Sequence, residues 1–248
     1  MRKIYVVTQK ELVNSDRLQG ATAIVIDVFL ATSTITFLLE KNYQPVYAAE
    51  NQEHAMNIAN QLGSDTPLML GEKNGESING FGFPDPRLLK HSEQQNAAII
   101  CSTNGTRAIE AAKRAKKLYI SSITNGHLVA KSVDQESINH SPIVLVCSGN
   151  GGHFSLEDFV GAGHIIDHLL KSGEFELNDA AKLARNTFIN VRSNNFIDLY
   201  SCDTKHLLER LGYPGSVDYV INQFEKVNVI PVYQEGKIMN ISSEVTQS

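Results

Sequence analysis

The clearest copy of a repeated pattern in this chain is VLVCSGNG at residues 144–151, an apolar run that stops on hydroxyl, amide and glycine residues. The pattern recurs in IICSTNG at 99–105 and LYISSITNG at 118–126. Each apolar run resembles a buried strand. If the three strands are parallel neighbours, their carboxyl ends place three loops rich in N–H groups beside one crevice, where open α/β sheets bind ligands. Such loops predict an anion site, because a helix start directs unpaired N–H groups at a bound charge.

Strand and helix patterns alternate over the first 150 residues. This alternation of short apolar runs with helical patterns predicts a three-layer α/β/α sandwich with a mainly parallel or mixed central sheet. The expected strands are 4–7, 23–27, 46–48, 68–70, 97–101, 117–121 and 143–147, and the expected helices are 31–41, 52–62, 106–115 and 126–132.

The second part of the chain has a different pattern. Residues 155–226 predict consecutive helices, the first capped by Ser155, and residues 227–240 predict a hairpin. The only unusually long loop is expected at 71–86, and such loops are usually functional or mobile. Because no linker rich in proline, glycine or serine divides the chain, we expect one domain over residues 1–248.

Composition limits the class of protein. The chain has 248 residues, 42% of them hydrophobic, and a net charge of −5, which argues against a general nucleic-acid binder. The start shows no long apolar segment and no run approaches a membrane span, so we expect a cytoplasmic protein without membrane contact. Three scattered cysteines form no disulfide framework, and Cys101 and Cys147 are expected to be buried. A homo-oligomer is compatible with these features.

Two acidic residues follow apolar runs in the same way. Asp27 precedes hydroxyl residues at 32–34, so its carboxylate is expected at the carboxyl edge of the sheet. Glu72 holds the matching position after PLMLG at 67–71. The two acids could share one Mg²⁺ ion, which prefers carboxylates, waters and phosphate oxygens. Other interpretations stay open: Asp27 as a nucleophile or a helix cap, and Glu72 as a solvated loop acid.

Two loops supply candidate anion-binding groups. TNGTR at 103–107 places a guanidinium near a helix start, where a bound anion is the simplest explanation for it and a surface ion pair is the alternative. SGNGGH at 148–153 is a second donor-rich loop, and its histidine is a candidate acid or base or a plain loop histidine. The predicted catalytic residues are Asp27, Arg107 and His153. The predicted substrate-binding residues are Thr103, Asn104, Gly105, Thr106, Ser148, Gly149, Asn150 and Gly151.

Five motifs occur in a fixed order over most of the chain: DVFLATST at 27–34, GEK at 71–73, TNGTRA at 103–108, FSLED at 154–158 with the following Ala162-Gly163, and VIPVY at 229–233. Together they resemble the magnesium-dependent 2-phosphosulfolactate phosphatase family. The resemblance implies a three-layer α/β fold that hydrolyses 2-phosphosulfolactate to sulfolactate and phosphate, with Mg²⁺ as cofactor. The expected partner is a small phosphorylated or sulfonated metabolite.

The chain departs from that family pattern at several positions. Leu30 stands where the family carries arginine, FPDP at 83–86 replaces a Gly-Asn-Ser-Pro-like stretch, and the family's His-Gly-Arg segment is missing near 202–206. An arginine that binds an anion contributes about 1.5–3 kcal/mol, so its loss changes the substrate, the rate or both. The alternative hypothesis is a phosphatase-like protein with a changed substrate or no catalysis, which binds a small anionic metabolite.

Overall fold

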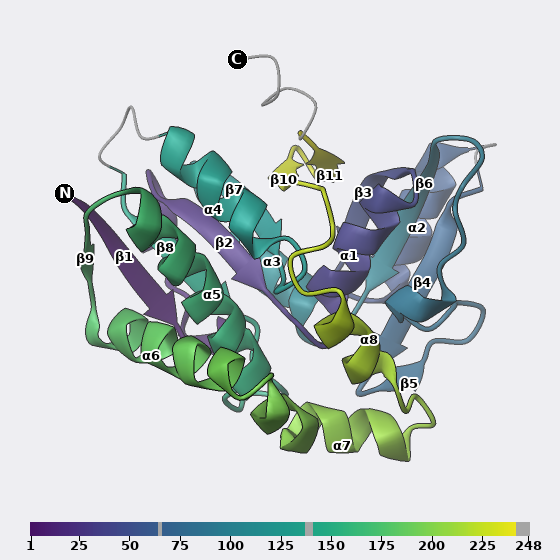
Figure 1. Ribbon diagram of the computed structural model, residues 1–248. Coiled ribbons are helices and arrows are strands. Elements are labelled where there is room, and N and C mark those ends of the chain that lie inside the picture. The colour runs from purple at the N-terminus through teal and green to yellow at the C-terminus, as the bar shows by residue number, and fades with distance from the viewer. Residues whose placement is uncertain (64–65, 137–140, 242–248) are drawn as a thin grey trace.

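The computed structural model describes residues 1–63, 66–136 and 141–241 and places their strands in one mixed sheet (Figure 1). The strands are β1 (Arg2–Val7), β2 (Thr22–Ile26), β3 (Tyr43–Ala49), β4 (Leu68–Lys73), β5 (Glu76–Ser77), β6 (Asn96–Cys101), β7 (Lys117–Ser121), β8 (Ile143–Cys147), β9 (Phe175–Leu177), β10 (Pro231–Gln234) and β11 (Lys237–Asn240). Their order in the sheet is β5-β4-β6-β3-β11-β10-β7-β2-β8-β1-β9.

Helices cover both faces of this sheet. They are α1 (Ala31–Glu40), α2 (Gln52–Leu62), α3 (Gly105–Ala112), α4 (Gly126–Gln135), α5 (Leu156–Ser172), α6 (Asp179–Ser193), α7 (Asp203–Arg210) and α8 (Ser216–Asn222), with short 3-10 turns at Lys10–Leu12, Ser15–Leu18, Pro86–Leu88 and Ile197–Ser201. Figure 1 shows α4, α5 and α6 side by side over one face.

The central strand β2 shows why the apolar runs of the sequence do not alternate with polar residues. Its Ile24 and Ile26 pack in one core cluster with residues of α4, α5 and α6, whereas Ala23 and Val25 pack in another with residues of α1 and α3. Because side chains of a strand alternate between its faces, both faces of β2 are buried under helices. This arrangement confirms the predicted three-layer α/β/α sandwich.

The C-terminal hairpin corrects one prediction about the sheet. β7 and β8 both pair in parallel with β2, but β6 pairs with β3 and β4 on the other side of β10 and β11. The three pattern-bearing strands are therefore not all neighbours, and the condition on which all three loops were expected beside one crevice is not met. The hairpin enters antiparallel between β3 and β7, and local patterns give no information on a pairing between segments so distant in sequence.

The expected long loop at 71–86 also differs in its first part. β4 continues to Lys73 and turns antiparallel into β5, so Glu72 lies inside a strand rather than after it. β9, which pairs with β1 at the edge of the sheet, was not predicted because three residues carry too little periodicity. The predicted cap of α5 is confirmed, since the Ser155 hydroxyl accepts a hydrogen bond from the N–H of Asp158 at 3.2 Å.

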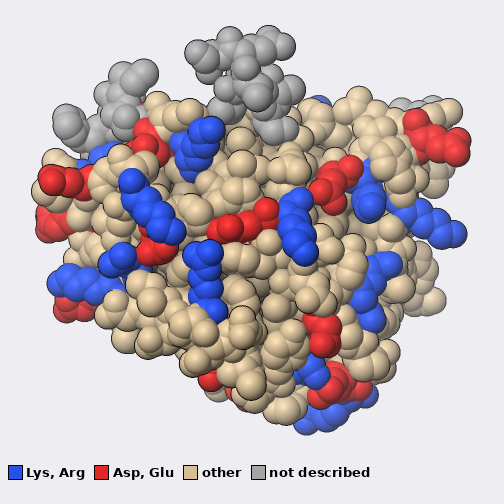
Figure 2. All heavy atoms as spheres, viewed as in Figure 1, with Lys and Arg blue, Asp and Glu red and all other residues tan. Residues whose placement is uncertain are grey.

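The surface carries mixed charges. On the face shown in Figure 2, Lys and Arg side chains are interspersed with Asp and Glu, and no continuous basic tract crosses that face. None of the helices in the described ranges combines the length and the hydropathy needed to cross a bilayer.

Candidate active site

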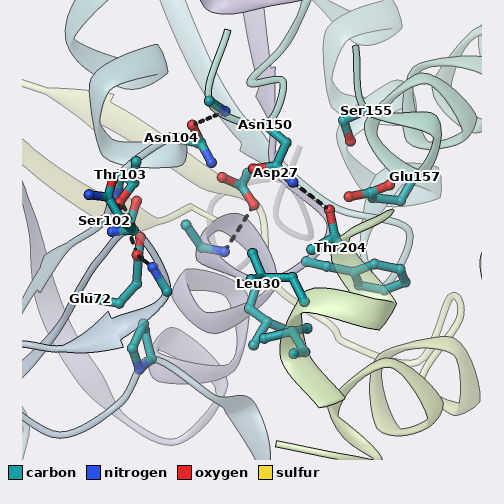
Figure 3. Close-up of a pocket in the computed structure, with 18 of the residues that line it drawn as sticks. Asp27, Leu30, Glu72, Ser102, Thr103, Asn104, Asn150, Ser155, Glu157 and Thr204 are labelled. Carbon is teal, nitrogen blue, oxygen red and sulfur yellow. Dashed lines mark hydrogen bonds between the residues drawn. The ribbon is translucent and has the colours of Figure 1, made fainter. Parts of the chain in front are cut away.

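A pocket of about 220 Å³ lies at the ends of strands from both sides of the β10–β11 hairpin (Figure 3). Residues that follow β2, β6 and β8 line it, together with residues of β4, the start of α5 and α7. Its lining consists of Asp27, Phe29, Leu30, Ala31, Glu72, Asn74, Gly75, Phe83, Pro84, Ser102, Thr103, Asn104, Gly149, Asn150, Gly151, Ser155, Glu157, Asp158, Thr204, Leu207, Leu208 and Leu211. The structure therefore brings the two predicted metal ligands, Asp27 and Glu72, into one pocket.

Asp27 is the central acid of the pocket. It follows β2 directly, its residue is only 6% exposed, and its Oδ1 accepts a hydrogen bond from the N–H of Ala31 at 3.2 Å. Burial, together with the negative charges of Glu72 and Glu157, raises its pKa to about 7. Asp27 thus stabilises the start of α1 and also faces the pocket. Its interpretation as a helix cap and its interpretation as a site residue are therefore compatible.

Glu72 is held by the loop that follows β6. Its Oε1 accepts from the N–H of Thr103, and its Oε2 accepts from the Thr103 hydroxyl at 2.9 Å and from the N–H of Gly75 at 2.7 Å. Three donors to one carboxylate fix its position. The interpretation of Glu72 as a solvated loop acid is therefore wrong, and the cause is the fold: β4 runs beside β6 and brings the two segments together.

Two further acids, Glu157 and Asp158, belong to the pocket and were not predicted as site residues. Both are buried in the first turn of α5. Asp158 accepts from the N–H of Val28 at 2.8 Å and from that of Gly149 at 3.1 Å, so it joins the ends of β2 and β8. Burial and the charges of Asp27 and Glu157 raise the pKa of Asp158 well above its usual range. Two adjacent acids directly after a glycine-rich loop were the available signal.

The start of α3 offers main-chain donors. Within the described part of the chain, the N–H groups of Asn104 and Gly105 meet no acceptor. Gly105 is required by close approach: a Cβ at this position would lie 2.5 Å from the Cβ of Ala31 and 2.7 Å from Oδ2 of Asp27. The predicted residue Thr106 instead exchanges hydrogen bonds with Ser102 at the base of the helix and does not line the pocket.

The loop at 148–151 uses its main-chain donors within the protein. The N–H of Gly149 donates to Asp158, that of Asn150 to the carbonyl of His153, and that of Gly151 to Oδ1 of Asn104. The predicted nest of free N–H groups is thus wrong at these three residues, because two side chains and one main-chain carbonyl accept from them. Gly149, Asn150 and Gly151 still line the pocket, whereas the buried Ser148 does not.

Lys10 is a cationic residue that sequence reasoning missed. Its Nζ lies 2.9 Å from Oδ1 of Asn104 and 3.3 Å from the carbonyl of Ser148, and it also pairs with Glu11 at 2.8 Å. Its side chain is only 10% exposed. Lys10 therefore ties the loops after β6 and β8 together behind the pocket. The only signal in the sequence for Lys10 was its position shortly after the first expected strand, where a loop beside the site begins.

Two of the predicted catalytic residues lie outside this lining. Arg107 and His153 are exposed, and neither contributes to the pocket wall. His153 pairs with Asn150 through main-chain hydrogen bonds in both directions, which makes it part of the loop's own turn. The structure does not bring these two side chains together with Asp27, and their catalytic roles stay predictions.

The loop after β7 does not join the site. Ser122 and Thr124 are buried beneath α1, where their hydroxyls contact those of Ser33 at 2.6 Å and Thr36 at 3.2 Å. The prediction that all three pattern-bearing loops line one crevice is thus correct for two and wrong for the third. The hydroxyl groups of this loop form hydrogen bonds with buried hydroxyl groups of α1. The same residue types can therefore serve packing as well as ligand binding.

The side of the pocket opposite the donor loops is apolar. Leu30 and Phe83 line it, α7 adds Leu207 and Leu208, and Leu211 follows directly after this helix. In the described ranges no Lys or Arg side chain lines the pocket. The pocket is thus divided into a polar part beside the strand ends and a leucine-rich wall.

The acidic part of the pocket fits a hard divalent cation. Four carboxylates line it: Asp27 after β2, Glu72 in β4, and Glu157 and Asp158 in the first turn of α5. The pKa values of Asp27 and Asp158 are raised partly by neighbouring carboxylates, so negative charge accumulates there without a lining cation to balance it. Carboxylate oxygens are the ligands that Mg²⁺ prefers. The donor set therefore agrees with the predicted magnesium site.

Comparison with known proteins shows the family of the chain. A family model described as 2-phosphosulpholactate phosphatase matches residues 7–236. The chain belongs to this family. A protein of Clostridium perfringens strain 13, named probable 2-phosphosulfolactate phosphatase, is 33% identical over 98% of both chains. Proteins with the same name from Clostridium beijerinckii and Clostridium acetobutylicum are 29% and 30% identical, over 95% and 96% of this chain and 98% and 100% of theirs.

Proposed function

We propose that this chain is a magnesium-dependent phosphoric monoester hydrolase whose first candidate substrate is 2-phosphosulfolactate. The observation that carries the proposal is the meeting of four carboxylates with the donor-bearing start of α3 in one pocket. Membership of the family supports the reaction class. Mg²⁺ bound by Asp27 and Glu72 would supply positive charge for the phosphoryl oxygens.

The chain's own residues account for the remaining charge and position. The N–H groups of Asn104 and Gly105 can donate to a phosphoryl oxygen at the start of α3, where the helix dipole favours an anion. Oδ1 of Asn104 already accepts from Lys10 and Gly151, which leaves its amide NH₂ group to donate. Fixed donors of this kind stabilise developing negative charge without reorganisation.

The attacking group is either water or the carboxylate of Asp27. Both fit the position of this acid, and a substrate made chiral at phosphorus distinguishes them. Inversion would indicate direct attack by water, and retention would indicate two successive displacements through a phosphoenzyme.

The leucine-rich wall favours a second candidate substrate. 2-Phosphosulfolactate carries a carboxylate and a sulfonate besides its phosphate, whereas Leu30 and the leucines of α7 offer no charge to meet them. A phosphate monoester with an uncharged or apolar tail suits this wall better, because an unpaired anion against apolar surface is costly to desolvate. The four carboxylates of the pocket disfavour the alternative of a non-catalytic anion binder, since an anion would be repelled there without a cation.

Phosphate release with 2-phosphosulfolactate and a panel of small phosphate monoesters, with and without Mg²⁺, tests the proposal. We expect magnesium-dependent turnover of at least one of them. No turnover of any substrate, combined with tight metal-independent binding of an anion in calorimetry, would instead identify a binding protein. A cytoplasmic location is part of the proposal and is supported by three cysteines that are all free and buried.

A further inference from the structure

We propose that the chain holds a second metal site, for a zinc-like transition-metal ion, formed by His164, His168 and Glu225. The two histidines lie one turn apart on α5, and Glu225 follows α8. None of the three lines the pocket, and the nearer histidine is six residues along α5 from Asp158, which corresponds to about 9 Å of helix. The site is therefore separate from the proposed magnesium site.

The three side chains converge at one point. Nε2 of His164 lies 2.8 Å and Nε2 of His168 lies 2.7 Å from the same carboxylate oxygen, Oε1 of Glu225. One potential ligand atom of each residue lies within 4.8 Å of the other two. Two histidines four residues apart on a helix point to the same side, and with one carboxylate they form a ligand set that suits Zn²⁺ far better than Mg²⁺.

Hydrogen bonds hold the three side chains together when no ion is bound. The carboxylate of Glu225 accepts a hydrogen bond from Nε2 of each histidine. An ion bound at both nitrogens would replace these two protons, which would leave or move to Nδ1.

The surroundings of the cluster resemble those of a bound ion. The His164 ring packs 5.1 Å from that of Phe188 and 4.9 Å from that of Phe224, which shields one side. The ring of His127 lies 6.1 Å from that of His168, and Nδ1 of His127 is buried without a hydrogen-bond partner in the described structure. The side chains of His168 and Glu225 are 25% and 26% exposed, which leaves access from solvent. A fourth position is thus open to His127 or water.

Glu225 is held in an unusual conformation at this point. Its φ is +56°, a left-handed value that glutamate rarely adopts, and its N–H donates to the carbonyl of Ile123 at 3.1 Å. Outliers of this kind cluster at ligand sites. An ion here would join α5 to the segment between α8 and β10, and we infer a structural rather than catalytic role.

Calorimetric titration with Zn²⁺ in excess Mg²⁺, which is present to occupy the proposed magnesium site, tests the second site. We expect one Zn²⁺ per chain in the unmodified protein, and binding weakened at least about tenfold in His168→Ala and in Glu225→Gln, since even an indirect partner of a metal ligand contributes that much. His91→Ala, which removes an exposed histidine elsewhere, is the matched control and should bind as the unmodified protein does. Equal binding in all four proteins, or none in any, would overturn the site.

A measurement without substitutions covers the case in which a variant fails to fold. Crystals grown with Zn²⁺ and measured at the zinc absorption edge should show an anomalous peak about 2.0–2.2 Å from the two imidazole nitrogens and the carboxylate oxygen. A peak only in the pocket, or no peak, would show that the three residues form a hydrogen-bonded cluster without a metal.

Discussion

At the scale of single residues, Lys10 rather than Arg107 contacts the loops of the site. Neither side chain lines the pocket, but Lys10 reaches Asn104 and the carbonyl of Ser148, whereas Arg107 is exposed. We predict that Lys10→Met lowers kcat/KM about 10- to 100-fold, since hydrogen bonds of charged groups contribute about 1.5–3 kcal/mol. Arg107→Met should lower it less than about threefold. Phosphate-release kinetics on both variants check this, and a larger loss in Arg107→Met would restore the original assignment.

Gly105 gives a second prediction at this scale. Replacing glycine by alanine within a helix normally stabilises it by up to about 1 kcal/mol. Here the added methyl group would press on Ala31 and on the carboxylate of Asp27. We predict that Gly105→Ala lowers both the melting temperature and the activity. Lys113→Ala, at the exposed end of the same helix, should change neither; a Gly105→Ala variant with unchanged activity would contradict the close approach.

At the scale of elements, local patterns predicted most of the fold. β2, β6, β7 and β8 and the helices between them lie close to their expected bounds, because buried strands and amphipathic helices leave periodic signals. The order of strands could not be predicted in this way. The antiparallel entry of β10 and β11 between β3 and β7 depends on packing between distant segments, which no local periodicity records.

The site was predictable to a similar extent. Asp27 was found because a lone acid after a buried strand is conspicuous, and Glu72 because it repeats that position. Glu157 and Asp158 resembled ordinary first-turn acids of a capped helix, and only the structure shows that they are buried beside Asp27. The polar loop after β7 shows the converse error, since its hydroxyls serve α1 instead of a ligand.

Helix α7 supports a prediction about substrate choice. Its Leu207 is half-buried and lines the pocket wall, which carries no basic side chain in the described ranges. We predict that Leu207→Arg raises kcat/KM for 2-phosphosulfolactate relative to an alkyl phosphate by several fold, because the new cation meets a second anion. Leu207→Gln is the neutral control. An unchanged ratio in Leu207→Arg would show that the substrate tail does not reach α7.

At the scale of the whole molecule, acidic residues from both sides of the β10–β11 hairpin lie close together in the pocket. Their closeness and burial make the stability of the fold depend on pH. The pKa of Asp27 is raised to about 7 in the folded chain, above the usual value near 3.8, so the folded state holds a proton that the unfolded state loses. Asp27 should therefore make stability without metal fall as pH rises between about 4 and 7, whereas His164, whose pKa burial lowers to about 4, should make it rise with pH up to about 6.5. Thermal unfolding in a chelator isolates the first effect when the unmodified protein is compared with Asp27→Asn. The stability of the unmodified protein relative to the variant should fall over this range, and a constant or rising difference would contradict the assignment.

The central claim is that the buried carboxylates bind the cation on which activity depends. The most direct test measures phosphate release as a function of Mg²⁺ concentration, after chelation, for the unmodified protein and for Glu72→Gln, which keeps the shape of the side chain but removes its charge. We predict no activity without Mg²⁺ and at least a tenfold higher Mg²⁺ requirement in the variant. Full activity in the chelator, or an identical Mg²⁺ requirement in Glu72→Gln, would contradict the claim.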